Sequence, residues 1–216
     1  MFKNSNFSQF FRSYEILLQK KLLIFSALTI GILCSTQNLL HAQNTDIHAQ
    51  SALKKSISTQ KSGMIVLGSW ATLNIISGSI GFFNSSGSVK YFHQMNTAWN
   101  IVNLGIAGFG YHGAATMNST MGYSEVLDKM QSFDRILLIN AGLDLAYIGT
   151  GAWLWKRGLD KNSDRQVGYG KSLILQGSFL LLFDSVLYLI HNKHTQNLIQ
   201  ITDQLTFTGN GFVLNF

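Results

Sequence analysis

Long apolar stretches of helical length alternate with shorter polar segments along this chain. Each of four stretches has about 20 residues, which is enough for a helix to cross a hydrocarbon core of about 30 Å. The pattern therefore predicts an all-α membrane protein, a four-transmembrane-helix antiparallel bundle with spans at about 63–83, 91–111, 135–155 and 171–191.

A shorter apolar stretch, LLIFSALTIGILC, lies near the start of the chain, directly after Lys20 and Lys21. A basic flank, a short apolar core and a small residue at Ala42 are typical of a secretory signal peptide. Leu40 occupies a site that prefers a small residue, so cleavage near Ala42 and retention as an uncleaved anchor both stay open. The predicted division is a signal segment at 1–42, an extracytoplasmic lead-in at 43–62, the transmembrane domain at 63–191 and an extracytoplasmic tail at 192–216.

Basic residues set the predicted orientation. Cytoplasmic loops of membrane proteins carry an excess of Lys and Arg. The connection 156–170 and the start of the last span are basic, with Lys156, Arg157, Lys161, Arg165 and Lys171. We therefore expect a multi-pass protein of a bacterial inner membrane, with both ends of the mature chain outside the cytoplasm.

Two segments outside the spans have patterns of their own. The stretch SEVLDKMQSFD, at 124–134, places Val126, Leu127, Met130 and Phe133 on one helical face, which predicts a helix lying on the outer membrane surface. The final stretch, LTFTGNGFVLNF, alternates apolar and polar residues around a Gly-Asn-Gly turn and predicts a short β-hairpin. Its arms are too short to span a membrane, so the hairpin is expected outside it.

Polar residues recur inside the apolar spans. In the second span His93, Asn96, Asn100 and Asn103 are spaced +3, +4 and +3, which forms one stripe on a helix. An unpaired amide in hydrocarbon costs several kcal/mol, so these groups must face one another or a water-filled cavity. The predicted polar intramembrane seam consists of Asn74, His93, Asn96, Asn100, Asn103, Asn140, Asp144, Gln176 and Asp184.

This seam has two interpretations. In the first, the amides and protonated carboxyls are interhelical hydrogen-bonding groups, worth about 0.6–2 kcal/mol each. In the second, Asp144 and Asp184 form a hydrophilic pocket or proton path, because ionisable groups inside a membrane are expensive and often functional. The first interpretation is favoured. It makes the chain a non-enzymatic structural or partner-binding membrane component, and the alternative is a transporter or ligand-binding channel subunit.

Composition excludes several other classes of protein. The net charge of +6 is spread along the chain without a basic run, so nucleic acid is not an expected partner; the bilayer is, together with a protein partner or a second copy. Cys34 is the only cysteine, which excludes an internal disulfide. No nucleophile elbow, H-E-x-x-H motif or convincing catalytic triad is visible, so we expect neither an enzyme nor a cofactor. His112, His191 and His194 are weak candidates for a metal site near the outer surface, and no metal is predicted.

Three stretches resemble a known family. GMIVLGSWATLNIISGSIG, KYFHQMNTAWNIVNLGIAG and KSLILQGSFLLLFD are similar to an uncharacterised family of small four-helix integral membrane proteins of Bacteroidota, a domain of unknown function. The resemblance covers about 63–191. It implies a four-helix membrane domain behind an exporting leader, and it implies no activity and no catalytic residues.

Overall fold

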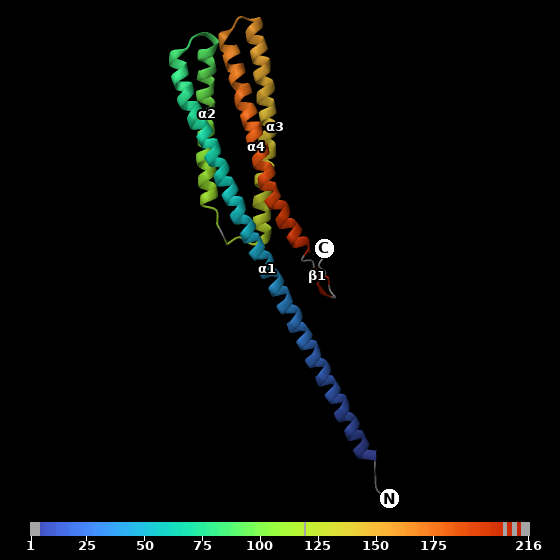
Figure 1. The fold of residues 1–216 in the computed structure, drawn as a ribbon. Helices are drawn as coiled ribbons and strands as arrows, with labels where there is room; N and C mark the ends of the chain where they lie inside the picture. Colours follow the sequence, from blue (N-terminus) through green and yellow to red (C-terminus); the bar gives the residue numbers. More distant parts are fainter. Residues whose placement is uncertain (1–4, 119, 205–206, 209–210, 213–216) are drawn as a thin grey trace. The chain divides into compact units, whose positions relative to one another are not determined.

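The computed structural model describes residues 5–118, 120–204, 207–208 and 211–212 (Figure 1). Residues 1–46 and 47–216 form two separate compact units. Helix α1 (Ser5–Asn84) begins in the first unit, so the predicted signal segment is helical from Ser5 onward. Cleavage of that segment stays a prediction.

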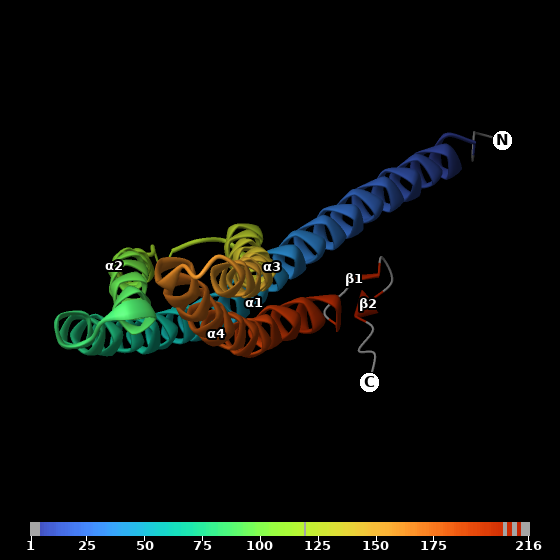
Figure 2. The same cartoon turned by 90° about the horizontal axis from the view of Figure 1, so that it is seen from above.

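The second unit is a bundle of four helices. It contains α1 from residue 47 onward, α2 (Gly87–Ala115), α3 (Tyr123–Asp160) and α4 (Asp164–Gln204). The short α1–α2 and α3–α4 turns lie at one end of the bundle, and the longer α2–α3 loop lies at the other (Figure 1). Helix α4 packs against both α2 and α3, as the view in Figure 2 also shows. The predicted all-α four-helix bundle is confirmed.

Two residues in the left-handed region make the short turns possible. Only two residues separate the end of α1 from Gly87, the first residue of α2. Gly87 has a φ of 57°, and glycine adopts this conformation without a steric penalty. Asn162, with φ of 50°, lies between α3 and α4, and asparagine tolerates the same region better than most residues. These tight turns fix the antiparallel order of each helix pair.

Helix length and hydropathy make the chain a multi-pass membrane protein. Three helical segments are long and apolar enough to cross a membrane: Asp46–Asn84, Tyr123–Asp160 and Asp164–Ile201. Helix α2 does not reach the same hydropathy among the described residues, so its crossing stays a prediction. Burial is reversed relative to a soluble protein, since Phe109 is 83% exposed while Asn100 is 0% exposed.

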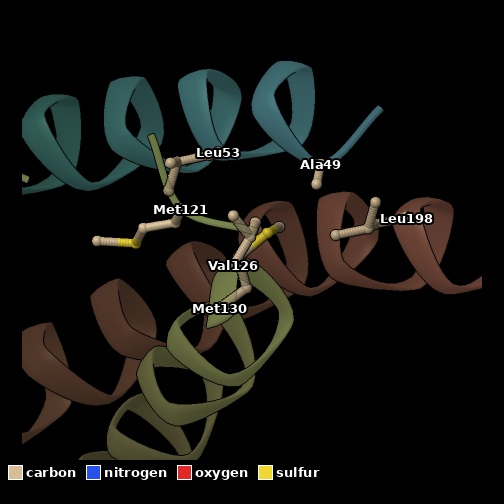
Figure 3. Close-up of a cluster of buried hydrophobic side chains, with 6 residues drawn as sticks. All are labelled: Ala49, Leu53, Met121, Val126, Met130 and Leu198. Carbon is tan, nitrogen blue, oxygen red and sulfur yellow. The ribbon is translucent and has the colours of Figure 1, made fainter. Parts of the chain in front are cut away.

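The bundle continues past the predicted spans at the end that carries the α2–α3 loop. There Ala49 and Leu53 of α1, Val126 and Met130 of α3, and Leu198 of α4 form a buried cluster with Met121 (Figure 3). The predicted surface helix at 124–134 is therefore wrong in two respects. Its residues belong to the continuous helix α3, and Val126 and Met130 pack against protein because α1 and α4 project far enough to cover them.

Glycine residues allow α3 and α4 to approach closely. A Cβ atom placed on Gly151 of α3 would lie 2.7 Å from the Gly170 carbonyl oxygen and 2.9 Å from the Ile174 backbone nitrogen of α4. Real Cβ atoms do not come so near to backbone atoms, so only glycine fits at this crossing. Small residues at helix contacts are typical of membrane bundles, where close backbone packing replaces the hydrophobic effect.

The chain ends in two very short strands. β1 (Phe207–Thr208) and β2 (Gly211–Phe212) pair antiparallel, with Phe207 opposite Phe212. Residues 205–206, 209–210 and 213–216 lie outside the described residues, and so do the turn and outer arms of the predicted hairpin.

Candidate functional site

The centre of the seam joins three helices through Asn96. Its Nδ2 atom donates to Asn74 Oδ1 at 3.0 Å, and its Oδ1 atom accepts from Gln176 Nε2. Gln176 Oε1 in turn accepts from Trp70 Nε1 at 3.1 Å. Asn74 and Trp70 belong to α1, Asn96 to α2 and Gln176 to α4. Both polar atoms of the Asn96 side chain are thus bonded to other helices, which is what an amide in hydrocarbon requires.

The α2 stripe continues from this centre within its own helix. Asn100 Nδ2 donates to the Asn96 carbonyl oxygen at 2.8 Å, and Asn103 Nδ2 donates to Asn100 Oδ1 at 3.4 Å. All three asparagines are buried. The +4 and +3 spacing therefore lines up amide groups that satisfy one another along one helical face.

His93 and Asn140 differ from the other predicted seam residues, because each is only half-buried. The His93 ring packs where Gly81 of α1 leaves room for it, and its Nδ1 atom has no hydrogen-bond partner among the described residues. Every other predicted seam residue is buried.

The two intramembrane carboxyl groups meet across the α3–α4 contact. Asp144 and Asp184 are 3% and 6% exposed, and their side chains interact with each other. Asp144 Oδ2 has no hydrogen-bond partner among the described residues. Asp144 Oδ2 thus shares with His93 Nδ1 the lack of a partner in the seam.

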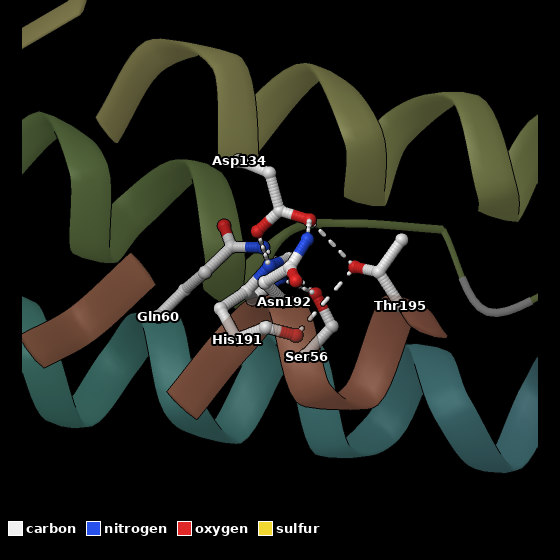
Figure 4. Close-up of polar contacts among 6 residues, drawn as sticks. All are labelled: Ser56, Gln60, Asp134, His191, Asn192 and Thr195. Atoms are coloured by element: carbon white, nitrogen blue, oxygen red, sulfur yellow. Dashed lines mark hydrogen bonds and ion pairs between the residues drawn. The ribbon is translucent and has the colours of Figure 1, made fainter. Parts of the chain in front are cut away.

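A second polar cluster lies at the end of the bundle that carries the α2–α3 loop (Figure 4). Asp134 Oδ1 lies 2.7 Å from His191 Nδ1, and Asp134 Oδ2 accepts from Thr195 Oγ1 at 2.8 Å and from Asn192 Nδ2 at 3.2 Å. His191 Nε2 lies 2.6 Å from Ser56 Oγ. Helices α1, α3 and α4 are thereby connected through a single carboxylate and a single imidazole.

Proton positions in this cluster follow from its chemistry. A carboxylate can only accept, so His191 Nδ1 carries the proton that faces Asp134. With the ring neutral, Nε2 accepts the Ser56 hydroxyl proton. Ser56 Oγ in turn accepts from Gln60 Nε2 at 3.0 Å. Every polar atom named here has a partner, so the cluster is a closed network.

The chain of contacts from Ser56 to His191 to Asp134 also resembles a catalytic triad, in which a histidine takes the proton of an attacking hydroxyl. Access argues against that role. Ser56 is 1% exposed and His191 is 0% exposed, so no substrate carbonyl can reach Ser56 Oγ in this arrangement. The geometry is that of a contact between helices.

Comparison with known proteins identifies the family. A model described as "Family of unknown function (DUF6992)" matches residues 66–185. The chain belongs to DUF6992. No curated protein and no solved structure matches the chain.

The DUF6992 region contains the seam from Asn74 to Asp184, whereas the second cluster is divided. Asp134 lies inside the DUF6992 region, and Ser56, Gln60, His191 and Thr195 lie outside it. The second cluster therefore extends beyond the DUF6992 region, and like the seam it involves α1 and α4.

The weak metal candidates do not come together around one point. Both ring nitrogens of His191 are engaged by Ser56 and Asp134, and His112 is exposed near the end of α2. No group of three or more His, Cys, Asp or Glu side chains in the described part of this DUF6992 protein is placed to hold a metal ion.

Sequence analysis did not predict the second cluster. Its members come from three helices, and the bonded residues Ser56 and His191 are 135 residues apart, so no local motif marks them. One signal was present: Asp134 shares the apolar face of Val126 and Met130, at +8 and +4 from them, and a carboxylate on a buried face requires partners.

Proposed function

We propose that this DUF6992 protein crosses a bacterial inner membrane four times, with α2 as the fourth span. Asn96 of α2 bonds to Asn74 and Gln176, which lie in two helices that are long and apolar enough to span. Groups that are hydrogen-bonded to each other lie at the same depth, so α2 enters the hydrocarbon together with its neighbours. The asparagines lower its hydropathy, but they face the bundle centre.

We further propose that the protein is a non-enzymatic structural or partner-binding component of the membrane. The observation that carries this proposal is the use of the seam amides, which bond to one another across α1, α2 and α4. Groups engaged in this way hold helices in one arrangement and are not free for a substrate. Native mass spectrometry of the protein extracted in lipid nanodiscs should give a stable complex with a partner or a second copy. A single chain throughout contradicts partner binding.

The non-enzymatic role makes a prediction for Ser56. A fluorophosphonate probe labels serines whose hydroxyl is activated and accessible, and Ser56 has only the first property because it is buried. We expect labelling of the membrane-embedded protein to be the same for the wild type and for Ser56→Ala. Labelling that is saturable and disappears in Ser56→Ala would make the protein a serine hydrolase instead.

A second candidate function rests on the carboxyl pair. Asp144 Oδ2 is buried without a partner among the described residues, and ionisable groups inside a membrane are often functional. This observation favours a transporter or channel subunit that moves protons or a small cation through the seam.

Flux measurements in liposomes separate the two candidates. If the carboxyls serve only as hydrogen-bonding groups, wild-type protein and Asp184→Asn both give the proton and sodium flux of protein-free liposomes. If they carry ions, the wild type gives flux and Asp184→Asn abolishes it while keeping the fold. Asp184→Leu is the matched control for packing, and it should destabilise by roughly 1–3 kcal/mol in either case because it leaves Asp144 unpaired. We expect no flux.

A further inference from the structure

A small polar pocket lies between α1 and α4 at the end of the bundle that carries the α2–α3 loop. Its volume is about 130 Å³. Each helix contributes residues at the same spacing of +3, +1 and +3, so one stripe of each helix borders a shared groove. The lining residues are His48, Ser51, Ala52 and Lys55 of α1, and His194, Asn197, Leu198 and Ile201 of α4.

The polar lining consists entirely of side chains that can donate hydrogen bonds. Two histidines, a serine, a lysine and an asparagine supply donors, and no acidic residue among those the structure describes lines the pocket. The lysines that act on His194 are Lys55 and Lys193, and Lys55 lines the pocket itself. Asp134 does not line the pocket. The pocket therefore combines the positive charge of Lys55 with donors that have no partner among the described residues.

The other wall is apolar. Ala52, Leu198 and Ile201 contribute carbon atoms, and Leu198 is buried in the cluster of Figure 3. An apolar wall excludes water from one side of the pocket and strengthens charge-assisted hydrogen bonds formed on the other side. The positive charge of Lys55 repels a metal ion, so the two histidines are unsuited to binding one here.

We propose that this pocket binds a small oxyanion, namely inorganic phosphate or a small phosphate ester. Lys55 supplies the charge, and Ser51, Asn197 and the two histidines donate to the oxygen atoms. A volume of about 130 Å³ has room for one tetrahedral oxyanion. The site is independent of the intramembrane seam and goes beyond the structural role proposed above.

Depth in the membrane favours a soluble ligand over a lipid headgroup. Lys55 lies eight residues before the predicted start of the first span, which is about 12 Å along a helix, and His48 lies about 22 Å from it. Headgroups occupy roughly 5–8 Å on each side of the hydrocarbon. Most of the pocket thus lies in water, where a dissolved phosphate reaches it.

The proposal is tested with the full chain in nanodiscs of neutral phosphatidylcholine. A ligand that binds only the folded protein raises its melting temperature in a saturable way. Inorganic phosphate is titrated against chloride at matched ionic strength, and the concentration at half-saturation is read from the melting curves. We expect saturation with phosphate and none with chloride.

Variants place the effect at the pocket. Lys55→Gln and His194→Gln should each weaken phosphate binding at least fivefold. Lys54→Gln is the matched control, because it removes the same charge from an exposed neighbour that does not line the pocket, and it should change binding less than twofold. Circular dichroism shows whether each variant keeps its helices.

Three results would overturn the proposal. One is the absence of a saturable response to phosphate in the wild type. Another is an equal loss in Lys54→Gln and Lys55→Gln, which would mean general charge screening. The third is a response that requires anionic phosphatidylglycerol in the nanodisc, which would assign the pocket to a lipid headgroup.

Discussion

Asp134 illustrates how a buried charge is stabilised at the end of a membrane bundle. Its two oxygen atoms contact three side chains of α4, and one of these, His191, also contacts Ser56 of α1. Removing an acceptor that is shared by several buried donors is destabilising, because each donor then lacks a hydrogen-bond partner. The cluster therefore depends on this residue more than on any other of its members.

We expect Asp134→Ala to lower the free energy of unfolding by about 1–3 kcal/mol for each buried donor that it leaves without a partner. Asp128→Ala is the matched control, because Asp128 is an exposed aspartate on the same helix and its loss should change stability by no more than about 0.5 kcal/mol. Denaturation in mixed detergent micelles measures both. Equal stability of the two variants would show that the cluster does not hold the helices together.

The residues on one helix were predictable from spacing, and the partners on other helices were not. The stripe of Asn96, Asn100 and Asn103 follows from helical periodicity, and all three are buried. That Asn96 bonds to Gln176 and not to Asp184 depends on how α2 and α4 are rotated, which spacing within one helix does not determine. The contact between Ser56 and His191 also depends on how two helices are rotated, so spacing within one helix does not predict it.

At the scale of the helices, apolar length predicted the membrane segments but not the ends of the helices. Helix α3 has 38 residues, while its predicted span has about 20. The apolar stretch is limited by the bilayer, whereas a helix continues as long as its side chains find something to pack against. Val126 and Met130 pack against α1 and α4, so α3 begins well before the predicted span.

The close contact between α3 and α4 at Gly151 can be tested by mutation. Gly151→Ala should destabilise by roughly 1–3 kcal/mol, because its Cβ would lie 2.7 Å from the Gly170 carbonyl oxygen and would push the helices apart. Gly149→Ala is the matched control on the same helix, since its Cβ would meet no atom within 4 Å. Alanine has a higher helix propensity than glycine, so the control variant should be more stable than the wild type by up to about 1 kcal/mol. Thermal unfolding in nanodiscs compares them, and destabilisation of both variants would refute a specific contact.

At the scale of the whole molecule, the bilayer explains why polar residues lie inside and apolar residues lie outside. Lipid offers no hydrogen bonds, so Asn96 and Gln176 turn toward each other, while Phe83 and Phe109 are more than 80% exposed. This reversal follows from the sequence once the spans are recognised. The direction in which the chain crosses the membrane depends on the flanking charges instead.

Those charges predict that the α3–α4 turn lies in the cytoplasm and that the start of α3 lies outside it. The test uses Asp160→Cys and Ser124→Cys, two exposed positions at opposite ends of α3, each in a chain whose Cys34 is replaced by serine. A membrane-impermeant maleimide should label Ser124→Cys in intact spheroplasts and Asp160→Cys only after permeabilisation. The reversed pattern would invert the orientation. Labelling of both positions from outside would mean that α3 does not cross the membrane, although its length and hydropathy are sufficient.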